Sequence, residues 1–165
     1  MNEVNIRQAT MDDLEGCYVV ELRCFVPSQA ATKEKIKKRL ELFAAGFFVA
    51  QLDGQVIGML NSGATYKDDI TDEALKAMVG HDPDGPNIII FSVAVLPEFQ
   101  RRGVAAKLLN RFIERARSLN KEKAFLICKP HLVRYYQKFG FIDVGPSAST
   151  FAGFKWHEMY LPLLL

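Results

Sequence analysis

Two groups of residues in this chain have types and a spacing that suit chemistry. The first is Gln100-Arg-Arg-Gly-Val-Ala105, which follows an apolar segment and Pro97. A basic loop that enters a helix brings free backbone N–H groups to the positive end of the helix dipole. Arg101 and Arg102 would add charge there, and Gly103 would let a ligand reach the backbone. The pattern predicts a turn that binds pyrophosphate; the alternative is a basic surface loop that ends in glycine.

The second group is the pair Tyr135 and Tyr136, within Leu132-Val-Arg-Tyr-Tyr-Gln-Lys-Phe-Gly-Phe141. A phenol with a pKa near 10 stays protonated at neutral pH and can donate a proton. A tyrosine on a short helix more commonly marks the edge of the core. The residues alone leave both interpretations open.

Together the two groups resemble the hallmarks of the GNAT superfamily of N-acetyltransferases. The segment 100–105 resembles the acetyl-CoA motif of that family, Gln/Arg-x-x-Gly-x-Gly/Ala, and 132–141 resembles its tyrosine-bearing helix that closes in Phe-Gly-Phe. The resemblance spans nearly the whole chain and is strongest over 88–146. Within the superfamily the chain looks most like the arylalkylamine N-acetyltransferase branch, which includes the serotonin acetyltransferases.

This resemblance implies a co-substrate and the residues that hold it. Acetyl-CoA would place its pyrophosphate on the basic loop and its pantetheine along the strand before that loop, whose N–H groups would polarise the thioester carbonyl. Tyr136 matches the tyrosine that the family uses as general acid near the sulfur, and Tyr135 is the lesser candidate. The implied cofactor-binding residues are Val93, Ala94, Val95, Arg101, Arg102, Gly103, Val104, Ala105, Ala106 and Tyr136.

The general base is less clearly indicated. Vertebrate arylalkylamine acetyltransferases carry a His-x-His pair on the strand before the basic loop, but this chain has Ile89 and Phe91 at those positions. Glu21, Ser92 and His131 are the candidate substitutes, acting directly or by positioning a water. Each also has an ordinary structural interpretation, as a surface glutamate, a core hydroxyl and a helix start.

The implied reaction is direct attack of a primary amine on acetyl-CoA in a ternary complex. At pH 7, forming the neutral amine costs on the order of 4–5 kcal/mol unless the site lowers the amine pKa or supplies a base. The expected acceptor is a small arylalkylamine or alkylamine. The alternatives are a protein or peptide amine, or a CoA-binding module without catalysis. The aromatic residues expected to wall an acceptor pocket are Phe25, Phe47, Phe48, Phe91 and Phe151.

Composition limits the class of protein. The 165 residues are 49% hydrophobic and 24% charged, which is typical of a single soluble domain, here 1–165. The net charge of +2 is too small to predict nucleic-acid binding. Eight Lys or Arg lie within 98–123 and are expected mainly on a solvated helix face. The acidic segment 67–73 either faces a cationic substrate or begins a solvated helix.

Cysteine, histidine and apolar patterns exclude several other classes. Three cysteines and no secretory signal predict a cytoplasmic protein with reduced thiols, in which Cys17 and Cys128 are small core residues. His81 and His157 are too isolated to predict a metal site. No apolar run reaches the roughly 20 residues that a membrane span needs. The tail 161–165 is expected to pack on the body of the protein or on a second subunit, as in a homodimer.

Periodicity and turn residues predict an α/β (α+β) fold, a sheet with helices on both faces. The resemblance implies the GNAT fold, with a mixed, largely antiparallel sheet of six to seven strands. Asp53-Gly54 predicts a hairpin. The resemblance adds that the sheet splays at its fourth strand. The expected strands are a segment near Ile6, 47–52, 55–63, 88–95, 124–128 and two after Gly140. The expected helices are 10–25, 32–46, 71–79, one that begins after Gly103 and one that Gly140 ends.

Two of these helices have a predicted buried face. In the first helix the expected inner residues are Leu14, Tyr18, Leu22 and Phe25. In the long helix they are Ala105, Leu108, Leu109, Phe112, Ile113 and Ala116.

Overall fold

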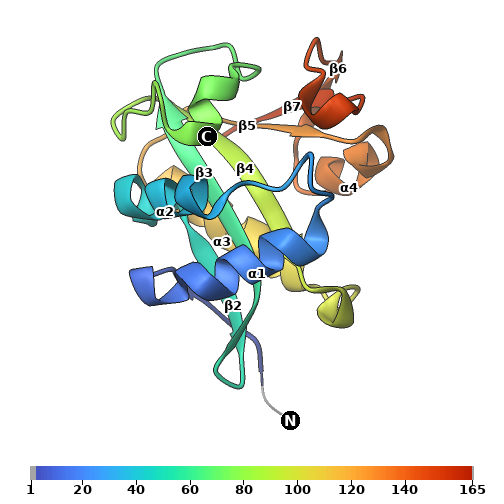
Figure 1. Ribbon diagram of the computed structural model, residues 1–165. Coiled ribbons are helices and arrows are strands. Elements are labelled where there is room, and N and C mark those ends of the chain that lie inside the picture. Colours follow the sequence, from blue (N-terminus) through green and yellow to red (C-terminus); the bar gives the residue numbers. More distant parts are fainter. Residues whose placement is uncertain (1–2, 165) are drawn as a thin grey trace.

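A seven-stranded sheet runs through the molecule in the computed structural model, which describes residues 3–164 (Figure 1). The strand order is β1-β2-β3-β4-β5-β7-β6, and all neighbours are antiparallel except β4 and β5. This is the mixed, largely antiparallel sheet that the family resemblance implies. The strands are β1 Asn5–Gln8, β2 Phe48–Leu52, β3 Gln55–Thr65, β4 Asn87–Val95, β5 Lys123–Cys128, β6 Ile142–Pro146 and β7 His157–Pro162.

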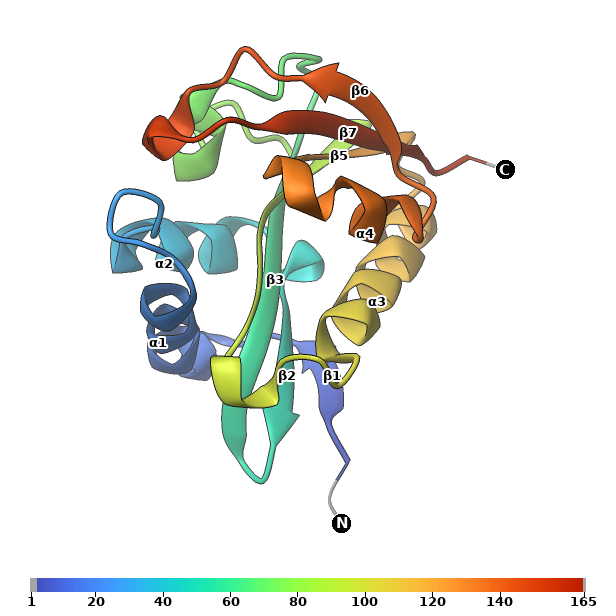
Figure 2. The same ribbon diagram turned by 90° about the vertical axis from the view of Figure 1, so that its right-hand side faces the viewer.

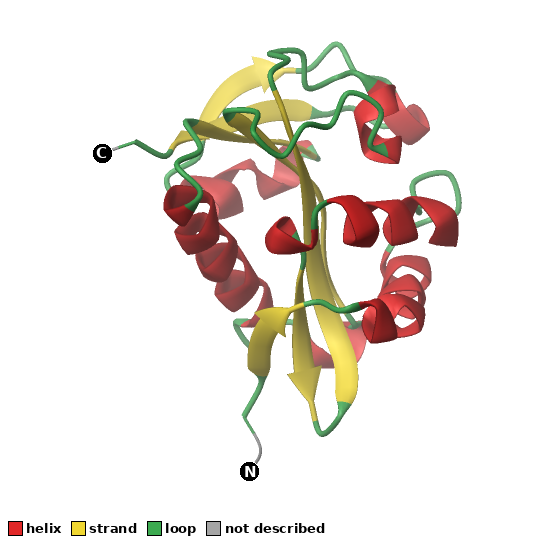
Figure 3. Ribbon diagram, turned by 90° about the vertical axis from the view of Figure 1, so that its left-hand side faces the viewer, coloured by secondary structure: helices red, strands yellow, loops and turns green. Residues whose placement is uncertain are grey.

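Helices cover both faces of this sheet, as expected (Figures 2 and 3). On one side lie α1 and α2, and on the other lie α3 and α4. The α-helices are α1 Leu14–Cys24, α2 Lys33–Leu42, α3 Val104–Ser118 and α4 Val133–Gln137. The 3₁₀ turns are η1 Met11–Asp13, η2 Ala44–Gly46, η3 Glu73–Ala77, η4 Pro97–Phe99, η5 Pro130–Leu132 and η6 Phe151–Gly153.

The long helix α3 buries the face that its spacing predicts. Leu108, Leu109, Phe112 and Ala116 are fully buried and Ile113 is 7% exposed. Such side chains at three-and-four spacing lie on one side of a helix, which here packs on β2, β3 and β4. Only Ala105 differs from the prediction, because it is half-buried at the entrance of the helix.

The predicted β2–β3 hairpin is also present. Asp53 and Gly54 both have positive φ, at 51° and 80°, which is the geometry of a type I′ turn. This turn lies at the end of the molecule away from β6 and β7 (Figure 2).

The prediction for the inner face of α1 is partly wrong. Leu22 is 52% exposed, whereas Cys17, Val20 and Glu21 are buried. Apolar residues lie on more than one side of this helix, so its spacing fits two different faces. Gly16 decides which face is buried. A Cβ there would lie 3.0 Å from Val56 Cβ, so the absence of a side chain lets α1 approach β3 closely on the side of Gly16.

The sheet splits between β4 and β5, which confirms the expected splay. The two strands pair only over Asn87–Ile89 with Lys123–Phe125, after which β4 stays with β3 while β5 stays with β7 (Figure 2). The backbone of β4 beyond Ile89 therefore faces an opening rather than a neighbouring strand. This opening positions the site described below.

Lys121 departs from the expectation that the basic residues of 98–123 are solvated. It is 4% exposed, and its ammonium donates to Gly85 O at 2.6 Å and to Pro83 O at 2.5 Å. The residue therefore fixes the segment that precedes β4. The helix expected over 71–79 is only the 3₁₀ turn η3, because Met78 adopts a left-handed conformation at its end.

Core and tail residues follow the remaining predictions. Cys17 and Cys128 are buried free thiols, and burial raises the pKa of Cys17 to about 12. In the tail, Leu161 and Leu163 are buried against the body of the protein, whereas Leu164 is exposed; Leu165 lies outside the described residues. No helix within 3–164 is long and apolar enough to cross a membrane.

Candidate functional site

A cavity of about 230 Å³ occupies the opening between β4 and β5. Its walls come from α1, η3, β4, β5, α4 and the segment around η6, so segments from much of the sequence meet there. Among the residues predicted for the site or its aromatic walls, those that line the cavity are Glu21, Phe25, Phe91, Ser92, Val93, His131, Tyr136 and Phe151.

The geometry separates the two tyrosines. Tyr136 lines the cavity, whereas Tyr135 is not among the lining residues and packs edge-on against Phe139 at 5.3 Å between ring centroids. The two tyrosine rings also contact each other edge-on, at 5.4 Å. Burial, with smaller contributions from Cys128 and Tyr135, raises the pKa of Tyr136 above its ordinary value. Tyr136 is therefore a protonated donor at neutral pH.

Glu21 and Ser92 form a connected pair in the cavity wall. Ser92 Oγ donates to Glu21 Oε1 at 3.2 Å, and Ala31 N–H donates to Glu21 Oε2 at 2.8 Å. The glutamate is only 2% exposed, so burial raises its pKa, although the hydrogen bonds and the charge of Arg39 oppose that shift. A carboxylate with a raised pKa is a stronger base than an exposed one.

The basic loop forms an open turn at the start of α3. Gly103 has φ 77°, and a Cβ built there would meet no atom within 4 Å. Lys107 N–H donates to Gly103 O at 3.1 Å, which leaves the preceding N–H groups of the first turn without a helical partner. Arg101 and Arg102 are exposed beside this turn. The arrangement fits a pyrophosphate, because both the space and the donors are present.

Gln100 has a structural task that the sequence did not predict. Its side-chain amide donates to Val95 O at 2.9 Å, so it ties the loop back to the last residue of β4. Cys24 Sγ lies 3.2 Å from the same oxygen. The turn before α3 is thereby fixed relative to the strand that borders the cavity.

Several sequence expectations for the cavity walls need correction. Phe47 and Phe48 are fully buried core residues and do not line the cavity, because their strand lies on the far side of β3 from the opening. His131 does line it but is exposed. His81 lies elsewhere, where its Nδ1 accepts from Ala64 N–H at 3.0 Å and burial lowers its pKa. Within residues 3–164, no three His, Cys, Asp or Glu side chains gather as a metal site would require.

Sequence reasoning missed the basic residues beside the cavity. Lys76, on η3, lines it with its ammonium 3.0 Å from the centroid of the Phe151 ring. Arg39, on α2, donates to Lys76 O and is 2% exposed. Arg39 falls in the lysine- and glutamate-rich segment 33–42, and Lys76 follows the acidic segment 67–73. Both compositions are typical of solvated helices, so no local signal marks either residue as buried.

Comparison with known proteins identifies the family. The model of the acetyltransferase (GNAT) family matches residues 8–141. This chain belongs to that family. The GNAT fold is thus confirmed, and the family implies that the protein binds an acyl-CoA.

Individual GNAT relatives are distant. Serotonin N-acetyltransferase of Mesocricetus auratus is 26% identical over 163 residues, covering 87% of this chain and 77% of that protein. The loading GNATL domain of CurA from Lyngbya majuscula has a TM-score of 0.86 at 17% identity, over 98% of both chains. The GphF GNAT-like decarboxylase, solved with isobutyryl-CoA, has a TM-score of 0.83 at 15% identity, over 97% of this chain and 100% of that one. At such identities the two structures support the fold alone.

Proposed function

We propose that this GNAT enzyme transfers an acetyl group from acetyl-CoA to a small primary amine, of the arylalkylamine or alkylamine class. The observation that carries the proposal is that a buried carboxylate and a protonated phenol line one cavity, at the point where β4 parts from β5. Amine acetyl transfer removes a proton from the ammonium and adds one to the leaving thiolate, and these two groups suit those two steps.

Acetyl-CoA would supply an activated acyl group as a thioester. The N–H groups of the first turn of α3, from Gly103 to Ala106, would hold its pyrophosphate together with Arg101 and Arg102. The backbone of β4 from Val93 to Val95 would lie along its pantetheine arm. Because these donors are fixed by the fold, they can polarise the thioester carbonyl without reorganising during the reaction, a contribution of about 2–4 kcal/mol.

Glu21 and Tyr136 would manage the two protons. Glu21 accepts a proton from the ammonium group of the acceptor, directly or through a water that Ser92 positions. Tyr136 donates its phenolic proton to the departing thiolate, whose ordinary pKa near 8.5 makes it a modest base. The second proton that the attacking nitrogen loses as the amide forms restores the phenol. The apolar walls help by removing water from the amine, which lowers the amine pKa.

The shape of the cavity supports a small acceptor rather than a protein. The contact between Lys76 and Phe151 joins the segments around η3 and η6 across the cavity. A volume of about 230 Å³ lies just below the range of roughly 300–1,000 Å³ for small-molecule sites. A long open groove for a peptide would require these two segments to separate.

The test is to mix the protein with acetyl-CoA and a panel of amines, and to follow the release of free thiol. Acetylated product with one or more small amines supports the proposal. Turnover only with peptide amines would assign the second class of acceptor. Binding of CoA in calorimetry without turnover of any amine would make the protein a CoA-binding module instead.

A further inference from the structure

A second hollow of about 90 Å³ adjoins the cavity and has a different character. Glu21, Ser92 and Lys76 line both spaces, whereas Tyr136 lines only the cavity and Arg39 lines only the second hollow. Tyr136 and Arg39 thus lie at opposite ends, with Glu21, Ser92 and Lys76 at the junction. We call the second space the cationic hollow, because its wall contains Lys35, Arg39 and Lys76.

The cationic hollow has more positive than negative charge. Three cations line it, and Glu21 is the one carboxylate among its lining residues. Arg39 gives its hydrogen bonds to neutral oxygens, to Asn61 Oδ1 at 3.0 Å and Lys76 O at 3.1 Å, so Glu21 is its electrostatic partner. Burial lowers the pKa of Arg39 to about 10.

Among the described residues, Lys76 makes no close ion pair with a buried carboxylate, although the charge of Glu21 is near enough to interact with it. Its ammonium contacts the face of Phe151 and lies 3.7 Å from Glu73, whose side chain is 55% exposed. The lysine side chain itself is only 17% exposed, and burial lowers its pKa to about 8. Asp72 also borders the cavity, but its carboxylate already accepts from Lys67 Nζ and from Ala74 N–H, both at 3.0 Å. Buried charges are normally paired, so the site lacks one anion.

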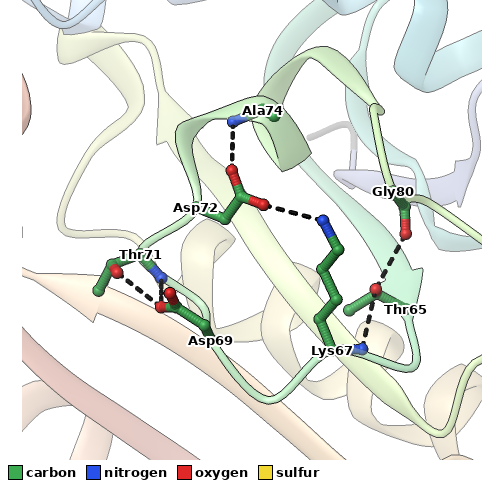
Figure 4. Close-up of polar contacts among 7 residues, drawn as sticks. All are labelled: Thr65, Lys67, Asp69, Thr71, Asp72, Ala74 and Gly80. Atoms are coloured by element: carbon green, nitrogen blue, oxygen red, sulfur yellow. Dashed lines mark hydrogen bonds and ion pairs between the residues drawn. The ribbon is translucent and has the colours of Figure 1, made fainter.

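The fold holds Lys76 in place rather than leaving it on a mobile chain. Asp72 caps η3, and Lys67 in turn holds Asp72 (Figure 4). Thr65 Oγ1 donates to Gly80 O at 2.9 Å and closes the base of the same loop. A cation fixed in this way is preorganised for a ligand.

We infer that the acceptor is an amine that carries a carboxylate, as an amino acid does, with the carboxylate against Lys76 in the cationic hollow and the amino group beside Glu21 and Ser92. This inference rests on the proposed acetyl transfer. An arylalkylamine without a carboxylate would bring a further positive charge beside Lys76 and Arg39. A carboxylated amine supplies an anion for Lys76. Its carboxylate would lie in the cationic hollow while its amino group lies beside Glu21.

The first test measures binding, which does not depend on catalysis. 3-Phenylpropionate, a carboxylate without an amine, is titrated into the CoA-saturated protein by calorimetry. We expect Lys76→Met to weaken its binding at least tenfold, and Lys76→Arg, which keeps the charge, to restore most of the affinity. Lys38→Met, an exposed lysine on α2, is the matched control and should change nothing. Equal affinity in wild type and Lys76→Met would overturn the inference.

The second test measures acceptor preference in pairs that differ only in the carboxylate: alanine and ethylamine, methionine and 3-methylthiopropylamine, phenylalanine and phenethylamine. We expect kcat/KM to favour the carboxylated member of at least one pair tenfold or more, and Lys76→Met to abolish that preference. A preference for the plain amine in all three pairs would contradict the inference while supporting acetyl transfer.

Two other outcomes are distinguishable. If no amine releases thiol but 3-phenylpropionate binds through Lys76, the anion site stands and the proposed acetyl transfer fails. The protein could instead release CO₂ from malonyl-CoA, and Lys76→Met could abolish that release. Lys76 would then bind the carboxylate of the acyl group, and the inference about the acceptor would be wrong. Thermal melts of each variant show whether a loss reflects misfolding.

Discussion

At the scale of single residues, Tyr136 is set apart from Tyr135 by what surrounds each ring. Tyr136 lines the cavity, and Tyr135 packs between Tyr136 and Phe139. We predict that Tyr136→Phe lowers kcat about 100-fold or more, because Tyr136 is the proposed proton donor to the departing thiolate. The dissociation constant of CoA, measured by calorimetry, should change little. Tyr135→Phe is the control, and an equal loss of kcat in both variants would remove Tyr136 from the mechanism.

Glu21 is predicted to control the acidic limb of the pH profile. Burial raises its pKa, and only its carboxylate form accepts a proton, so activity should fall as the pH drops through that raised value. We predict that Glu21→Gln lowers kcat/KM about 100-fold and removes the acidic limb. Glu15→Gln, an exposed glutamate on the same helix, is the control. If Glu21→Gln keeps the wild-type pH profile, the general base is another group.

At the scale of elements, the turn between β4 and α3 depends on Gly103. Its φ of 77° is strained for alanine, and a Cβ would enter the open space proposed for pyrophosphate. We predict that Gly103→Ala weakens CoA binding tenfold or more in calorimetry.

Gly54 offers a matched control for this substitution. Its φ is 80° and a Cβ there would also meet nothing within 4 Å, but it lies in the β2–β3 turn. Gly54→Ala should therefore introduce the same backbone strain of about 1–2 kcal/mol without weakening CoA binding. Equal losses of CoA affinity in the two variants would show that backbone strain, rather than a Cβ in the proposed pyrophosphate site, weakens binding.

At the scale of the whole molecule, an ion pair joins the first strand to the first helical turn. Arg7 donates two hydrogen bonds to Asp13, both 2.8 Å long, and Thr10 N–H donates a third of the same length. The hydrogen bond from Arg7 is the largest cause of the lowered pKa of Asp13. Because the carboxyl is buried, losing its charge is expected to destabilise the fold.

We predict that Asp13→Asn lowers the free energy of unfolding by about 1–3 kcal/mol at pH 7, measured by urea denaturation. Since the pKa of Asp13 is lower in the folded than in the unfolded protein, its contribution is complete above about pH 4 and is lost as the pH falls through the folded value. The difference between wild type and variant should therefore shrink at low pH. Asp12→Asn, exposed in the same turn, should have little effect at any pH.

The sequence by itself determined the features that depend on neighbouring residues. The inner face of α3, the Asp53-Gly54 hairpin, the turn at Gly103 and the order of the two family motifs all follow from spacing or from the φ that a turn requires. These local signals were enough to predict a sheet with helices on both faces, and the opening at the fourth strand followed from the family resemblance that the two motifs carry.

Only the tertiary structure decided which distant side chains meet in the cavity. Lys76 and Arg39 come from segments whose composition is typical of solvent-facing helices, yet both are largely buried beside Glu21. Phe47 and Phe48 are aromatic, as pocket walls commonly are, but they lie in the core. Leu22 faces solvent because α1 packs on β3 through the side that contains Gly16. Burial and charge pairing at such positions depend on contacts across the fold, which periodicity along the chain does not encode.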